Sequence, residues 1–175
     1  MRTFKIHFLV VALVIVIPLI TATAMAQSGQ VKINMLGNTV WVAGDPQLIL
    51  EMPYLQHPYL KVTSNSAGDL QWISTTVPFT LNSSVILGVY LCYATPDQGT
   101  YISQVRLVDY TLPTAATVRH DDGTDLIDPE GACYYSEATP FYPSGSLNLS
   151  LRLNFAQPGD EIRLGMLAIV IYETN

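Results

Sequence analysis

The C-terminal stretch 146–173 constrains the fold of this 175-residue chain more than any other segment. In residues 147–155 every second residue is apolar, and Asn, Ser or Arg lies between them. This period of two indicates a strand with one face in water. Residues 167–171 are all apolar, which indicates a strand covered on both faces. Residues 156–160 have the composition of a turn, so we interpret the stretch as a hairpin whose two strands differ in burial.

Further strand patterns, separated by Pro, Gly, Asn and Asp, run along the whole chain, and no amphipathic helical pattern competes with them. The longest internal one is 84–94, largely apolar on both faces, and 101–110 is predicted to be its hairpin partner. The remaining candidates are 31–35, 39–42, 48–50, 59–63, a segment beginning at Leu70, 116–120 and 132–137. We therefore predict an all-β protein, an antiparallel two-sheet β-sandwich of jelly-roll-like form with about eight to ten strands.

The order of these segments from about Trp72 to residue 173 carries a resemblance. Val77-Pro78 precedes residues 85–93, which are followed by 102–107, 146–155 and 162–172. This order resembles a jelly-roll-like β-sandwich domain that recurs in uncharacterised secreted bacterial proteins. The resemblance lies in apolar positions alone, so it implies a fold and supplies no catalytic residues.

The N-terminal residues have the pattern of a secretory signal peptide. Arg2 and Lys5 precede an apolar run at 8–20, and Ala24-Met25-Ala26 forms a small-x-small cleavage site. A retained membrane anchor is the alternative, but the run is short of the roughly 20 residues that span a bilayer, and it contains Pro18. We predict a signal peptide at 1–26, cleavage after Ala26 and a single domain at 27–175, secreted to the periplasm, cell surface or medium.

The charge of the predicted mature chain limits its partners. Six basic residues remain against fourteen acidic ones, which gives a net charge of −8. Nucleic acid and anionic lipid are therefore excluded as expected partners. Charged residues make up only 13% of the whole chain. Either a contact with another protein or a surface rich in uncharged polar residues accounts for this low fraction.

Cys92 and Cys133 are the only cysteines. In an exported protein an even cysteine count favours a disulfide, and two separate buried thiols are the alternative.

A loop rich in carboxylates begins at residue 120. Clustered oxygens beside a glycine suit a hard cation such as calcium, although the spacing is not that of an EF-hand. A solvated loop is the alternative, and no other cofactor is expected. The candidate ligands are Asp121, Asp122, Asp125, Asp128 and Glu130.

The sequence contains no recognisable catalytic constellation. His57 and His120 are the histidines of the mature chain, and both are predicted at the surface. Aromatic rings in or beside loops offer flat apolar surfaces for sugar rings, with packing as the alternative for each ring. The candidate ligand-binding tyrosines are Tyr54, Tyr59, Tyr134, Tyr135 and Tyr142.

These observations lead to three hypotheses. The first is a non-catalytic extracellular structural or adhesion module that associates with itself or with another extracellular protein. The second is a carbohydrate-binding module that uses the loop tyrosines, with calcium as a possible aid. The third is a polysaccharide hydrolase or lyase, which would need acids gathered in one cleft. If the loop tyrosines and the acids of residues 121–130 share one concave surface, that arrangement favours the hypothesis of ligand binding over that of a purely structural role.

Overall fold

The structure is a computed structural model that describes residues 30–35, 40–52, 59–77, 84–111 and 115–173. These residues form eleven strands, one more than the upper end of the predicted range. No helix within the described ranges is long and apolar enough to cross a membrane. The strands are β1 (Gln30–Met35), β2 (Trp41–Ala43), β3 (Leu48–Glu51), β4 (Leu60–Ser64), β5 (Gly68–Thr76), β6 (Ser84–Ala94), β7 (Tyr101–Thr111), β8 (Ala115–Asp122), β9 (Ala132–Phe141), β10 (Ser146–Phe155) and β11 (Glu161–Glu173).

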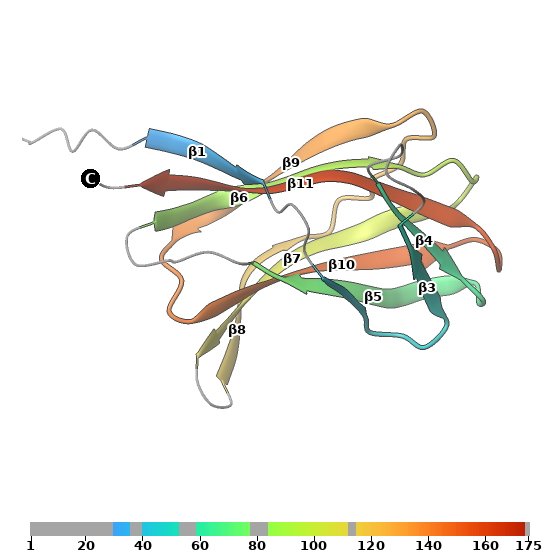
Figure 1. The fold of residues 1–175 in the computed structure, drawn as a ribbon, viewed down its shortest axis with the longest axis horizontal. Coiled ribbons are helices and arrows are strands. Elements are labelled where there is room, and N and C mark those ends of the chain that lie inside the picture. Colours follow the sequence, from blue (N-terminus) through green and yellow to red (C-terminus); the bar gives the residue numbers. More distant parts are fainter. Residues whose placement is uncertain (1–29, 36–39, 53–58, 78–83, 112–114, 174–175) are drawn as a thin grey trace, which may run out of the picture.

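The strands form two antiparallel sheets that face each other, as Figure 1 shows, so the predicted sandwich is confirmed. Sheet A has the order β3-β4-β11-β6-β9, and β1 pairs with β11 in addition. Sheet B has the order β2-β5-β10-β7-β8. The strands β9 and β8 are thus the last strands of their sheets, and they lie on the same side of the sandwich.

The core lies between the sheets and comes from the alternating residues that the sequence marks as apolar. Sheet B contributes the inner face of β10, in which Leu147, Leu149, Leu151 and Leu153 are fully buried. Sheet A contributes apolar residues of β6 and β11, including Ile169. Burial of one such side chain contributes about 1.5–3 kcal/mol, so this layer holds the two sheets together.

Two predicted hairpins are wrong, because their strands lie in different sheets. Strand β10 pairs with β5 and β7 in sheet B, whereas β11 pairs with β1, β4 and β6 in sheet A. Likewise β6 belongs to sheet A and β7 to sheet B. The turn after β10 is instead tied to neighbouring loops, with Gly159 N donating to Ser64 O at 2.8 Å and Ala156 N donating to Thr100 Oγ1 at 3.0 Å.

The outer faces explain why these strands separate. Neighbouring strands of one sheet share an outer face, so their outward residues must suit the same surroundings. Strand β10 turns Ser150 and Arg152 outward, beside the polar residues of β7. On β11, Ala168 and Val170 lie outside the core cluster and are still buried. The double burial predicted for residues 167–171 is confirmed, and it places β11 in the middle of sheet A.

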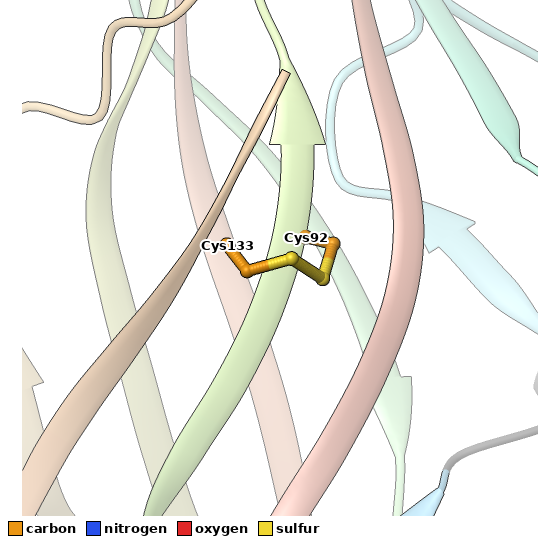
Figure 2. The surroundings of a disulfide bond; sticks show 2 residues. All are labelled: Cys92 and Cys133. Atoms are coloured by element: carbon orange, nitrogen blue, oxygen red, sulfur yellow. A yellow bond between two sulfur atoms is a disulfide. The ribbon is translucent and has the colours of Figure 1, made fainter.

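The disulfide between Cys92 and Cys133 is present and joins β6 to β9. The two residues are direct partners in the antiparallel register, and Figure 2 shows the bond between the two neighbouring strands. The bond ties the edge strand β9 to sheet A, and it is consistent with an extracellular protein. The predicted signal peptide at 1–26 lies outside the described residues and stays a prediction.

Candidate functional site

An open hollow of about 600 Å³ lies where the edge strands β8 and β9 meet. Strand β8 is the last strand of sheet B and β9 is the last strand of sheet A, and the two are in contact. The hollow therefore lies at the junction of the two sheets. Both strands turn polar side chains toward it. The hollow is lined by Arg119, His120, Asp121, Asp122, Tyr134, Tyr135, Glu137 and Thr139.

The carboxylate of Asp122 connects the two sheets at the base of this hollow. Its Oδ2 accepts hydrogen bonds from Ser136 Oγ at 2.5 Å and from the hydroxyl of Tyr134 at 2.9 Å, both on β9. Its Oδ1 accepts from the backbone N–H of Thr124 at 3.0 Å. Burial alone would raise the pKa of Asp122, but hydrogen bonds from Ser136, Thr124 and Tyr134 outweigh it and lower the pKa to about 2. Asp122 is therefore a fixed anion.

His120 extends this cross-sheet network, with its Nε2 lying 2.6 Å from Ser136 Oγ. The Ser136 hydroxyl has one proton, which goes to the anion Asp122, so Ser136 accepts from Nε2–H of His120. Burial lowers the pKa of His120 more than the nearby Asp122 and Asp121 raise it, which favours the neutral ring. His120 lines the open hollow at the surface, and its ring is partly buried against β9.

The order of these groups is not that of a catalytic triad. In a triad the histidine lies between serine and carboxylate and takes the serine proton. Here Ser136 lies in the middle, donates to Asp122 and is only 1% exposed. The three side chains fasten β8 to β9 and give no reachable nucleophile.

Tyr135 supplies the aromatic surface of the hollow. It is 40% exposed, and its hydroxyl donates to Leu87 O at 3.0 Å, which fixes the ring. The ring lies over Gly88 of β6. A Cβ at position 88 would lie 2.8 Å from the ring and 2.4 Å from Ser136 O, so glycine is required for this close approach.

Asp109 positions a residue of the hollow but does not line the hollow itself. This carboxylate of β7 is fully buried and accepts from Ser144 N at 2.9 Å, from Ser144 Oγ at 2.7 Å and from Gly145 N at 3.0 Å. Arg119 donates to it at 3.3 Å. Burial raises the pKa of Asp109, but these hydrogen bonds outweigh it and lower the pKa below its usual range. The ion pair thus holds one lining residue of the hollow in place.

The five candidate calcium ligands do not converge on one point. Asp121 pairs with Arg106, Asp122 bonds Ser136, and Asp128 accepts the N–H groups of Glu130 and Gly131 in a turn. Asp125 and Glu130 are exposed. Within the described ranges no group of three or more His, Cys, Asp or Glu side chains is arranged to hold a metal ion. Calcium binding by this loop stays a prediction that the geometry does not support.

The candidate tyrosines are divided among three places. Tyr134 and Tyr135 line the hollow together with Asp121 and Asp122. Tyr59 lies beside Arg163, whose guanidinium carbon is 5.7 Å from the ring centroid. Tyr142 is 60% exposed and does not line the hollow. Tyr54 and His57 lie outside the described residues.

The sequence-based reasoning missed three residues of the site: Arg119, Ser136 and Thr139. None belongs to a motif, because they meet their partners only through the packing of β8 against β9. One signal was available. Gly88 interrupts the longest apolar strand, and an isolated glycine in a strand indicates close approach by another segment.

No protein-family model and no curated protein matches this chain. Solved structures with a similar fold include the CBM22-1 xylan-binding domain of Xyn10C from Paenibacillus barcinonensis, with 11% identity and a TM-score of 0.55. That match covers 79% of this chain and 90% of the other. The family 11 carbohydrate-binding module of Lic26A-Cel5E from Clostridium thermocellum has 7% identity and a TM-score of 0.51, covering 81% and 96%.

A third similar structure is the CBM22-1–GH10 part of xylanase Xyn10B from Clostridium thermocellum, complexed with xylohexaose. It has 10% identity and a TM-score of 0.50, and the match covers 82% of this chain and 28% of that one. At these identities the likeness concerns the fold alone. This chain thus has a β-sandwich fold similar to that of several carbohydrate-binding modules.

Proposed function

We propose that this protein is a secreted, non-catalytic carbohydrate-binding module whose sugar site is the hollow between β8 and β9. One observation carries the proposal: Tyr134 and Tyr135 share that hollow with Asp121 and Asp122. Sugars present hydroxyl groups that both donate and accept, together with flat C–H faces. A fixed aromatic ring beside carboxylates, a histidine and an arginine matches both features.

The groups in the hollow are held in place before any ligand arrives. Tyr135 is fixed by its bond to Leu87 O, and Asp122 by three hydrogen bonds. Binding then requires little ordering of side chains, and such preorganisation favours affinity. The fold of the carbohydrate-binding modules named above supports this proposal over the adhesion hypothesis, for which no comparison gives support.

The charges of the hollow favour a neutral glycan. Asp121 is paired with Arg106, and Arg119 with Asp109. Asp122 remains ionised in a network of uncharged donors, and Glu137 adds a second carboxylate. Two negative groups repel uronic acids and sulfated sugars. We expect neutral sugars to bind better than acidic ones.

A glycan array that includes neutral xylans, other neutral glycans and acidic polysaccharides tests the proposal, with and without calcium. We expect neutral glycans to bind in both conditions. Calorimetry with the strongest ligand then compares Tyr135→Ala with Tyr142→Ala, since Tyr142 is an exposed tyrosine outside the hollow. The first variant should lose binding and the second should keep it. No binding to any glycan would refute the proposal.

Hydrolysis is the second candidate, because Asp121, Asp122 and Glu137 line one hollow. A glycosidase needs one carboxyl group with a raised pKa to act as general acid. The pKa of Asp122 is lowered to about 2, which is opposite to that requirement. Prolonged incubation of the protein with its strongest ligand, followed by assay for new reducing ends, decides between binding and cleavage. We expect none.

A further inference from the structure

The outer face of sheet B carries a second group of planar polar and aromatic side chains, which we name the Trp72 cluster. Its members are Trp72 on β5, Arg152 on β10, and Gln104 and Arg106 on β7. Arg152 is the register partner of both Trp72 and Gln104, and Ser150 is the partner of Arg106. The registers therefore place these side chains side by side on one face of three neighbouring strands.

Contacts with neighbouring side chains hold the members of the cluster in place. The guanidinium carbon of Arg106 lies 4.8 Å from the centroid of the Trp72 ring. Arg106 Nε and Nη2 each lie 3.1 Å from an oxygen of Asp121, a bidentate pair. Arg152 pairs with Asp69. Stacking and bidentate pairing restrict these side chains, so the surface is ordered before any ligand binds.

Two polar atoms on this face, Arg152 Nε and Asn148 Oδ1, have no hydrogen-bond partner among the residues that the structure describes. Leaving a buried polar atom unpaired is unfavourable. Both atoms are buried. Most buried polar atoms in folded proteins are paired, so these two atoms distinguish this face from an ordinary solvated surface.

Asp121 connects the Trp72 cluster to the hollow. It lines the hollow on β8, and it also accepts hydrogen bonds from Arg106 and Gln104 of β7. The surface is therefore continuous from β9 across β8, β7 and β10 to Trp72 on β5. Three strand spacings separate β8 from β5, a distance of roughly 14 Å. A single sugar ring is too short to cover it.

We propose that the Trp72 cluster is a second subsite, so that the ligand is an extended neutral polysaccharide lying across the strands of sheet B with one part in the hollow. This inference rests on the proposed function and adds the class of ligand to it. The Trp72 cluster takes the more distant sugars, with the Trp72 ring and the Arg106 guanidinium stacked over it as the planar surface. Asn148, Gln104 and Arg152 supply the polar groups.

The test measures affinity by calorimetry against chain length, with xylobiose, xylohexaose, cellobiose and cellohexaose as probes and the strongest array ligand as reference. For the wild type we expect six-residue chains to bind roughly tenfold more tightly than two-residue chains. Trp72→Ala should remove that gain and leave affinity for short chains unchanged. Tyr135→Ala should weaken binding at every length.

Controls separate this inference from loss of fold and from failure of the proposed function. Tyr110→Ala changes an exposed tyrosine on sheet B outside the Trp72 cluster and should leave the length dependence intact. Arg152→Gln, which keeps the ring of Trp72, tests the cluster if Trp72→Ala unfolds. Equal affinity for short and long chains, with both cluster variants unchanged, overturns the second subsite but keeps the hollow as a sugar site. Absence of binding by any glycan overturns both.

Discussion

Asp109 and Asp122 lie on neighbouring strands at the same side of the sandwich, and each accepts hydrogen bonds from three or more groups. Asp109 is fully buried, and its partners Ser144 and Gly145 belong to the connection between β9 and β10. Asp122 is half-buried, and it lines the hollow that we propose as the sugar site. The same chemical group thus serves stability where water is excluded, and in the proposed function it serves recognition where the surface opens.

The largest expected effect concerns the buried carboxylate, Asp109. Asp109→Asn leaves Arg119 and at least one donor of the β9–β10 connection without an anionic acceptor, and the free energy of unfolding should fall by about 3 kcal/mol. Chemical denaturation measures this loss. The folded fraction should still bind glycan, with a small loss of affinity, because Asp109 does not line the hollow but positions Arg119, which does. A loss of binding larger than the loss of stability would contradict the structural role.

Gly88→Ala should have the next largest effect, because it changes the packing beside the open hollow. Its Cβ would meet Ser136 O at 2.4 Å and displace β9 together with the Tyr135 ring. We expect a destabilisation of about 2 kcal/mol and a weaker glycan affinity. The matched control is Gly123→Ala, because a Cβ there meets nothing within 4 Å. Equal stability of the two variants would show that β9 does not need this close approach.

Asp122→Asn tests the open carboxylate directly. The amide keeps the shape but loses the charge that accepts from Ser136 and Tyr134, so we expect about 1.5 kcal/mol of destabilisation. Glycan affinity should fall roughly tenfold, measured by calorimetry on protein whose folding is confirmed by circular dichroism. The reverse pattern, a large loss of stability with unchanged affinity, would make Asp122 equivalent to Asp109.

The smallest effect is the pH dependence of stability. The pKa of His120 is lowered on folding, so the unfolded chain binds its proton first and stability should decrease as pH falls below about 6.5. Asp122 and Asp109 have lowered pKa values, so their contribution is complete above about pH 4 and is lost toward pH 2. Melting temperatures between pH 2 and 8 show both steps. His120→Gln should remove the first step only.

The site was only partly predictable. Tyr134, Tyr135, Asp121 and Asp122 were candidates because of their residue types and their loop-like surroundings, and the structure brings these four together. Tyr59 and Tyr142 had the same signal and lie elsewhere. Ser136 gave no signal, since a serine in a short alternating strand looks like any solvated position. Its role depends on β8, which approaches it from the other sheet.

The sequence by itself determined where most of the strands run and which of their faces are polar or apolar. These are local properties, because side chains alternate with a period of two along any strand. Only the tertiary structure decided that β10 and β11 enter different sheets, and that His120 and Asp122 meet Ser136 and Tyr134. Sheet membership depends on matching outer faces between strands far apart in the chain, such as β10 with β5 and β11 with β4. No local pattern encodes that match.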